Sequence, residues 1–254
     1  MIKVVLIGTG NVAKFLFDEF CTHPQLSIEQ VIGRNVAALE YFKEKVSVGN
    51  NYTELKQADI YILAVKDEVI QKVSIDVGNH EGLMVHTSGS IAMEALPENV
   101  RRGVFYPLQT FSGIAPKNST NIPLCLEAEN EEDYALLEGL ANCISSAVYR
   151  ISSEKRRQLH VAAVYANNFS NHMFFMAAEI CKEHGLSFEL LKPLILETSE
   201  KILQQSPFTA QTGPARRNDL KTIKEHLSLL SRPEQQKVYA TLTESIQQAY
   251  GKKL

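Results

Sequence analysis

The chain has 254 residues, of which 44% are apolar and 22% are charged, so it can form one large globular domain or two ordinary ones. Its net charge of −3 gives no indication of binding to nucleic acid or to a membrane surface. The four cysteines show no metal-ligand or disulfide spacing, and no apolar run reaches about 18 residues. We therefore expect a reduced, cytoplasmic protein that has no metal site and no membrane span.

Strands and helices are predicted to alternate through the first 150 residues. The sequence enters a strand pattern at its third residue, which leaves no room for a signal peptide. Alternation of this kind predicts an α/β fold, a doubly wound parallel-sheet Rossmann domain. The predicted strands cover residues 3–7, 27–34, 58–65, 82–90, 101–111 and 122–128, and the predicted helices cover 11–21, 36–46, 67–77 and 130–146.

The pattern becomes all-helical after residue 152. One helix of roughly 30 residues is predicted, with Ser153 as its N-cap and Gly185 just past its end. Further helices are predicted over 192–205, 219–230 and 233–250, with Asp219 capping the second of them. We expect a cofactor-binding domain at 1–152, an all-helical C-terminal domain at 153–254 for substrate binding and dimerisation, and a homodimer formed through the long helix.

The first predicted strand runs into the motif Gly8-Thr9-Gly10-Asn11-Val12-Ala13, which also opens a helix. In a dinucleotide site, the first glycine permits a tight turn and the second lets the backbone approach the pyrophosphate at the helix N-terminus. The motif therefore predicts a nucleotide-binding loop. The alternative is a strand–helix turn that binds nothing.

The end of the second predicted strand indicates which dinucleotide is bound. An NAD site has Asp or Glu there, whereas this chain has Arg34 followed by Asn35. Because a guanidinium binds a 2′-phosphate, we predict NADP(H). Ala64, Val65 and Lys66, at the end of the next strand, are expected beside the ribose and pyrophosphate. The alternative is that Arg34 and Lys66 are solvated loop residues that do not contact a cofactor.

Several motifs resemble known families. "IGTGNVA", "IGRN" and "LAVKD" are similar to the pyrroline-5-carboxylate reductase and beta-hydroxyacid dehydrogenase superfamily. "HTSGS", "FYPLQTF", "HVAAVYANNF" and "QTGPARRND" resemble a bacterial family of Rossmann-like NADP oxidoreductases with a C-terminal helical domain of unknown function. The resemblance covers nearly the whole chain and implies NADP-dependent oxidoreduction.

Three departures from these families affect the expected chemistry. Tyr106 stands where the bacterial family usually has His, and Asn218 where it usually has Gly. The hydroxyacid dehydrogenases carry a catalytic Lys four residues before an Asn on the long helix. The positions four before Asn167 and Asn168 are Ala163 and Val164, so Lys-assisted reduction cannot be transferred to this chain.

The long predicted helix provides other candidates for proton transfer. At 3.6 residues per turn, His160, Asn167, Asn168 and Asn171 share one face. We expect His160 to be the acid and Asn167 or Asn168 to orient the substrate. The alternative is that these side chains satisfy buried backbone groups or lie in a dimer interface.

Two further candidates follow later strands, at the edge where doubly wound sheets bind ligands. Ser88 in "HTSGS" is expected to bind a substrate carbonyl or carboxylate, whereas His86 is as readily structural. Gln109 in "PLQTF" is a candidate for contact with the substrate, and the alternative is that its amide only stabilises a turn. Together these predictions describe an NADP(H)-dependent oxidoreductase acting on a small carbonyl, imine or hydroxy acid. The alternative is a non-catalytic NADP(H)-binding sensor or regulatory protein.

Overall fold

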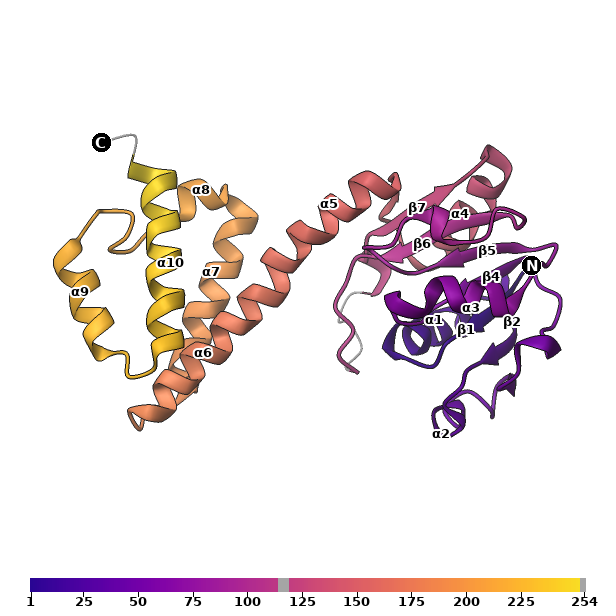
Figure 1. The fold of residues 1–254 in the computed structure, drawn as a ribbon, viewed down its shortest axis with the longest axis horizontal. Helices are drawn as coiled ribbons and strands as arrows, with labels where there is room; N and C mark the ends of the chain where they lie inside the picture. Colours follow the sequence, from indigo (N-terminus) through magenta and orange to yellow (C-terminus); the bar gives the residue numbers. More distant parts are fainter. Residues whose placement is uncertain (114–118, 252–254) are drawn as a thin grey trace. The chain divides into compact units, whose positions relative to one another are not determined.

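The computed structural model describes residues 1–113 and 119–251, and the chain divides into two compact units that meet between Asn167 and Asn168. The described part of the first unit contains one eight-stranded sheet with the order β3-β2-β1-β4-β5-β6-β7-β8 (Figure 1). Its strands are β1 (Ile2–Ile7), β2 (Leu26–Ile32), β3 (Ser47–Gly49), β4 (Ile60–Leu63), β5 (Leu83–His86), β6 (Arg102–Pro107), β7 (Leu124–Ala128) and β8 (Val148–Arg150).

The order and direction of the first six strands confirm the predicted Rossmann architecture. They all run parallel, and β1 lies between β2 and β4, which places the reversal of strand order beside the glycine motif. The sheet departs from the predicted parallel arrangement only at β7 among the described strands, which is antiparallel to β6, while β8 is parallel to β7. Between β6 and β7 the structure describes only a three-residue 3-10 turn, η4 (Ser119–Asn121), rather than the helical crossover usual for a parallel pair.

Strand β1 explains why the first predicted segment is continuously apolar. Its residues from Val4 to Ile7 are all fully buried. Val4 and Leu6 belong to one hydrophobic cluster, whereas Val5 and Ile7 belong to a second. Because side chains alternate across a strand, the sheet separates two cores and both of its faces are covered.

The first unit also contains five α-helices within the described residues, namely α1 (Asn11–Cys21), α2 (Val36–Leu39), α3 (Ile70–Val77), α4 (Glu131–Ile144) and α5 (Ser153–Ala163). The helix predicted over 36–46 is wrong beyond Leu39, because the amides of Phe42 and Lys45 bond to carbonyls three residues back and form successive turns. Leu39 and Phe42 are nevertheless buried, so successive turns bury the apolar residues that have helical spacing in the sequence. The N-cap of α5 is Ser152 rather than the predicted Ser153.

The second unit is helical in its described part, with α6 (Ser170–Glu183), α7 (Lys192–Gln204), α8 (Pro207–Ala210), α9 (Leu220–Leu229) and α10 (Pro233–Tyr250). Gly185 ends α6 as predicted, with a φ of +67° and the paired hydrogen bonds of a Schellman motif. Asp219 caps α9 as predicted by accepting from the amide of Thr222 at 3.1 Å. None of the helices within the described ranges is long and apolar enough to cross a membrane.

A π-helical segment, η5 (Val164–Phe169), separates α5 from α6. The chain is therefore helical from Ser153 to Glu183, as the sequence predicts, but not with uniform geometry. The expected sharing of one face by His160, Asn167 and Asn168 assumed 3.6 residues per turn. That spacing does not hold through a π-helix, whose hydrogen bonds span five residues. The shared face of these three residues therefore stays a prediction.

Candidate functional site

The glycine loop has the backbone geometry that a dinucleotide requires. Gly8 has a φ of +128°, and a Cβ on it would collide with the carbonyl oxygen of Ala64, the residue just after β4. Gly10 differs, since a Cβ there would meet nothing within 4 Å. Gly10 is also the N-cap of α1 and supplies no side-chain acceptor to the first-turn amides. The loop thus leaves open space before uncapped N–H groups, which is the geometry that the pyrophosphate of a dinucleotide such as NADP requires.

The other residues of the motif hold the loop in place. The side chain of Thr9 packs against Gly33, where a Cβ would lie 2.5 Å from Thr9 Cγ2. Asn11 donates from Nδ2 to the carbonyl oxygen of Phe111 at 2.8 Å, which ties the glycine loop to the segment after β6. Val12 is half-buried against the core. The motif therefore joins the ends of β1, β2 and β6 at one edge of the sheet.

Arg34 lies just past the end of β2, and its side chain is exposed. It takes part in none of the ion pairs found in the described ranges, so its charge is available to an anion. Burial raises the pKa of Tyr52, and the positive charge of Arg34 opposes that rise. The neighbouring Asn35 caps α2, accepting from the amide of Ala38 at 3.2 Å.

The end of β4 reaches the same edge of the sheet. Ala64 is buried with its carbonyl against Gly8, and Val65 is half-buried. Lys66 is exposed, with Nζ 4.0 Å from a carboxylate oxygen of Glu68. The Ala64 carbonyl thus restricts position 8 of the glycine loop to glycine, while Lys66 carries an exposed charge just after β4.

The turn after β5 is held by its own side chains. His86 is fully buried; its Nδ1 accepts from the amide of Ser88 at 3.2 Å, and its Nε2 lies 3.3 Å from the carbonyl oxygen of Ala92. Burial chiefly, helped by the charge of Arg156, lowers the pKa of His86 to about 4. The ring is therefore neutral near pH 7, with its proton on Nε2, and it shapes the turn.

Ser88 has a similar local role. Its Oγ accepts from the amides of Ser90 and Ile91, both at 3.1 Å, and the residue is only 6% exposed. Gln109, which follows β6, is exposed, and its Oε1 accepts from the next amide at 2.8 Å. In this structure both side chains are engaged with backbone groups next to them.

A buried arginine holds this turn against helix α5. Arg156 is fully buried and donates to the carbonyl oxygens of Ser88 at 3.2 Å and Ile91 at 2.5 Å. Its third contact is an ion pair with Glu127 of β7 at 2.5 Å, and Glu127 also accepts from the amide and hydroxyl of Ser153. Sequence reasoning missed this group, because "SEKRRQ" does not indicate which of its charged residues faces inward.

The turn meets two side chains that can exchange protons. Tyr106 Oη, on β6, lies 2.9 Å from His160 Nδ1, on α5. A Cβ on Gly89 would lie 2.5 Å from that nitrogen and 2.7 Å from Tyr106 Cζ. His160 is half-buried, and burial chiefly raises the pKa of Tyr106 to about 12. The first unit thus brings His160 to the turn after β5, whereas Tyr106 drew attention in the sequence only as a departure from the family.

The predicted asparagines lie at the π-helical segment. Asn167 and Asn168 are both exposed within η5, and the division between the two compact units falls between them. Asn171 and His172 follow on α6. Among the described residues, no group of three or more His, Cys, Asp or Glu side chains could hold a metal ion.

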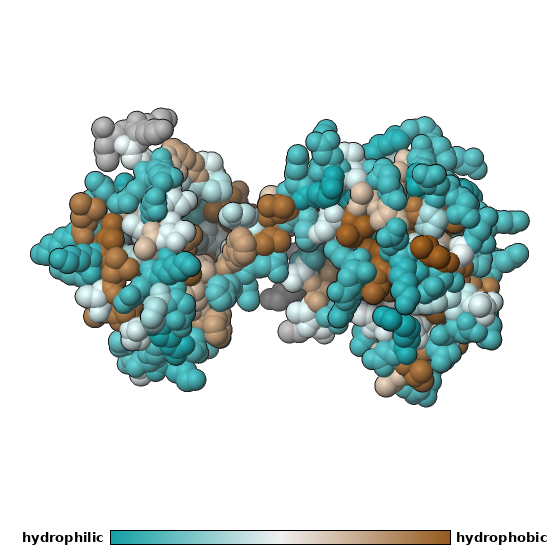
Figure 2. All heavy atoms as spheres, in the orientation of Figure 1, coloured by the Kyte–Doolittle hydropathy of each residue, from teal (hydrophilic) through white to brown (hydrophobic). Residues whose placement is uncertain are grey.

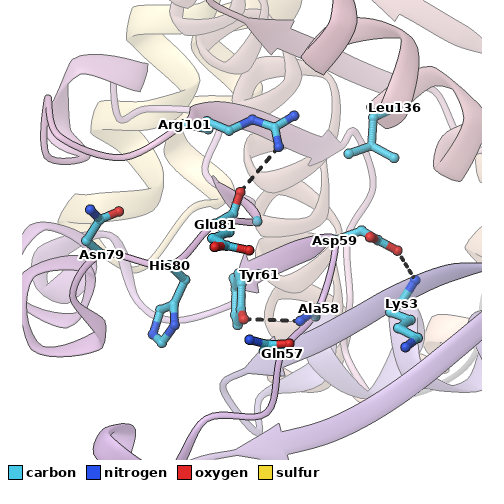
Figure 3. A pocket seen from close by; sticks show the side chains of 11 residues that line it. Lys3, Gln57, Ala58, Asp59, Tyr61, Asn79, His80, Glu81, Arg101 and Leu136 are labelled. Atoms are coloured by element: carbon cyan, nitrogen blue, oxygen red, sulfur yellow. Dashed lines mark hydrogen bonds between the residues drawn. The ribbon is translucent and has the colours of Figure 1, made fainter.

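A hollow lies at the other edge of the sheet (Figure 3). Its volume is about 540 Å³, and it is lined where β1, β4 and β5 begin. Two hydrogen bonds join groups of its lining, since the amide of Lys3 donates to Asp59 at 2.7 Å and Arg101 donates to the carbonyl oxygen of Glu81 at 3.3 Å. Doubly wound sheets bind ligands at the carboxyl ends of their strands, whereas this hollow lies at the opposite edge.

Comparison with known proteins agrees with this geometry. The family described as NADP oxidoreductase, coenzyme F420-dependent, matches residues 3–85, and the domain of unknown function DUF2520 matches residues 122–246. A solved structure described as a putative NADP oxidoreductase from Bacteroides fragilis is 38% identical, with a TM-score of 0.90 over 97% of this chain and 98% of that one. No curated protein matches the sequence.

Two more distant solved structures share the fold. A pyrroline-5-carboxylate reductase from Coxiella burnetii is 16% identical, with a TM-score of 0.57 over 98% of this chain and 97% of that one. A reductive aminase from Aspergillus terreus, solved with NADPH and ethyl-5-oxohexanoate, is 13% identical, with a TM-score of 0.71 over 100% of this chain and 95% of that one. The chain belongs to the family of the Bacteroides fragilis protein and is an NADP-dependent oxidoreductase.

Proposed function

From membership of this NADP oxidoreductase family, we propose that the protein transfers a hydride between NADP(H) and a small carbonyl, imine or hydroxy-acid substrate, with His160 as the proton-exchanging group. The observation that carries the proposal is the position of His160 against Gly89, in the turn after β5. The glycine loop follows β1 at the same edge of the same sheet. Reduction of a polar double bond needs both a hydride donor and a proton donor. In the proposal, the glycine loop holds the hydride donor and His160 is the proton donor at the same edge of the sheet.

Specific residues would hold the cofactor. NADPH supplies the hydride when bound. In the proposal, the loop from Gly8 to Val12 binds the pyrophosphate, with Thr9 and Asn11 fixing its shape. Arg34 forms charge-assisted hydrogen bonds to the 2′-phosphate, next to Asn35. The ribose side is lined by Ala64, Val65 and Lys66.

The substrate side is built from the remaining predicted residues. His160 gives a proton to the reduced oxygen or nitrogen, or takes one in the reverse direction. Asn167 and Asn168 orient the substrate through their amides. Ser88 and Gln109 complete the polar surroundings in this proposal. We also propose the functional division made from the sequence, with cofactor binding in residues 1–152 and substrate binding and dimerisation in 153–254.

A homodimer is part of the proposal. Apolar side chains are exposed on the second unit (Figure 2). Among its exposed large apolar residues are Leu190, Leu194 and Leu203, at 71%, 62% and 85%. Exposed apolar surface on this scale is typical of an interface. Multi-angle light scattering should give about twice the 28.4 kDa chain mass. A monomer at micromolar concentration would refute this part.

The cofactor proposal is tested by titration of NADPH fluorescence. Arg34→Ala should weaken NADPH binding by roughly 10- to 100-fold, the equivalent of one or two charge-assisted hydrogen bonds, and should leave NADH binding unchanged. Lys43→Ala is the control, since it removes an exposed charge that is paired with Glu40. Equal NADPH affinity in wild type and Arg34→Ala would refute the assignment of Arg34.

The catalytic proposal needs a substrate panel followed by NADPH oxidation. Ketones, cyclic imines and 2-hydroxy acids should be offered to wild type and to His160→Ala. We expect turnover of at least one class in wild type, and its loss in His160→Ala with NADPH affinity preserved. NADPH binding without turnover of any class would favour a sensor role over catalysis.

A further inference from the structure

The contact between Tyr106 and His160 commits one ring nitrogen and leaves the other available. The two rings meet edge to face, with centroids 5.9 Å apart and planes at 71°, and Tyr106 Oη lies 2.9 Å from Nδ1. Gly89 closes the same side of the imidazole, because a Cβ there would overlap Nδ1. Nε2 is therefore the nitrogen through which His160 can meet a substrate.

The surroundings of the phenol favour one direction for this hydrogen bond. Tyr106 is only 8% exposed, and it packs with Met93, Val104 and Cys125 in an apolar cluster. Burial raises its pKa to about 12, so the phenol keeps its proton near neutral pH. A protonated phenol donates to an imidazole nitrogen that carries no proton, and the proposal below takes this direction, from the Tyr106 hydroxyl to Nδ1. The neutral ring then carries its own proton on Nε2.

We propose that Tyr106 is a positioning residue that holds His160 as an Nε2–H donor, and that the substrate atom facing Nε2 is a carbonyl oxygen. This inference rests on the proposed catalytic role of His160. A carbonyl oxygen has lone pairs that accept from Nε2–H, whereas the nitrogen of a protonated iminium has none. The pair therefore selects a ketone or aldehyde over an iminium ion.

The proton balance of the reduction follows from this arrangement. When the carbonyl carbon receives the hydride, the electron pair of the C=O π bond moves to the oxygen, which takes the proton from Nε2. Nδ1 takes the phenolic proton of Tyr106, so the imidazole ends neutral and the phenolate regains a proton from water. The charge of Arg156 opposes the burial-driven rise in the pKa of Tyr106 and so favours the transient phenolate.

The tautomer can be measured without a substrate. Long-range proton–nitrogen correlation NMR on the full-length protein at pH 9 distinguishes a protonated Nδ1 from a protonated Nε2. The His160 signals are those lost in His160→Gln. We expect Nε2 protonated in wild type, and a changed pattern in Tyr106→Phe, which removes only the hydroxyl. A protonated Nδ1 in wild type, or identical His160 signals in Tyr106→Phe, would overturn the inference.

A matched control lies in the second unit, where Tyr239 Oη is 2.8 Å from His226 Nδ1 with centroids 5.8 Å apart. Tyr239→Phe should change only the His226 signals and leave kcat unchanged. Tyr106→Phe should lower kcat for a ketone by about tenfold, the rate equivalent of one hydrogen bond, with NADPH affinity intact.

The kinetic outcomes distinguish the positioning role of Tyr106 from the catalytic role of His160. The double variant Tyr106→Phe with His160→Gln should be no slower than His160→Gln alone, because both changes act on one unit. Full kcat in Tyr106→Phe overturns the positioning role. Full kcat in His160→Gln overturns the proposed function of His160, whatever the tautomer.

Discussion

Acid should destabilise the first unit through one buried histidine. The imidazole of His86 is fully buried, bonded to the amide of Ser88 and to the carbonyl of Ala92, and burial is the main cause that lowers its pKa to about 4. In the unfolded chain the same group titrates near 6.5. Below pH 6.5 the unfolded state therefore binds a proton that the folded state excludes, and the folded state loses stability.

The size of this effect follows from the two pKa values. At 1.36 kcal/mol per unit, the full difference between 6.5 and about 4 corresponds to roughly 3 kcal/mol. The His86 contribution is intact above pH 6.5, falls by about 2 kcal/mol between pH 7 and pH 5, and levels off below pH 4. Since domains are stable by only about 5–15 kcal/mol, this loss is measurable.

Two measurements test this reasoning. An NMR titration of the His86 Cε1 proton should give a midpoint near pH 4. Urea unfolding at pH 7 and pH 5 should show a free-energy loss about 2 kcal/mol larger in wild type than in His86→Asn, which keeps an acceptor near Ser88 but cannot titrate. A midpoint of 6 or above, or equal losses in both proteins, would refute the argument from burial.

Three further substitutions test other parts of the structure. Gly8→Ala places a Cβ against the carbonyl oxygen of Ala64 at a φ of +128°, and should abolish NADPH binding in fluorescence titration and lower the melting temperature. Arg156→Met leaves Glu127 without its buried partner and should lower the free energy of unfolding in urea by about 3–5 kcal/mol. The loss should be smaller when Glu127 is also changed to Gln, because no unpaired charge then remains. Asn218, with a φ of +53°, should tolerate Gly with little change, whereas Ala should cost about 1 kcal/mol.

The glycine loop was predictable from sequence because its constraints are local. Gly8 is required by its own positive φ and by the adjacent strand, and Gly10 by the helix that it caps. The buried strands were equally evident, since a strand covered on both faces must be continuously apolar. The left-handed conformation of Asn218, which was not predicted, accounts for the glycine that the resembling family usually has at this position.

The departures from prediction occurred where tertiary packing decides. The 36–46 segment has helical apolar spacing, yet Phe42 packs edge-on against Phe17 from a series of turns. The direction of β7 depends on how the chain returns from β6, which the apolar pattern of a strand does not encode. The π-helical turn at Val164–Phe169 contains no Gly or Pro that would indicate irregular geometry.

The polar groups around the candidate site could not be found by spacing. Arg156 bonds to groups 65 and 68 residues away, and Tyr106 bonds to a ring 54 residues away. Sequence proximity contains no information about such pairs. The departure of Tyr106 from the resembling family was nevertheless a usable signal, because a side chain that replaces a polar residue beside a motif is a candidate partner for another polar group.

Arg156 and His160 lie four residues apart on α5 and therefore on one face of the helix. The guanidinium of Arg156 bonds to the turn after β5, and the imidazole of His160 contacts Gly89 in that turn. The fixed Arg156 contacts to Ser88 and Ile91 set where Gly89 lies, and Gly89 in turn limits where the imidazole can sit. Any side chain at 89 would push the ring away from Tyr106. The position of the proposed proton donor is thus determined by backbone contacts rather than by its own flexible side chain, which is the preorganisation that proton transfer to a bound substrate requires.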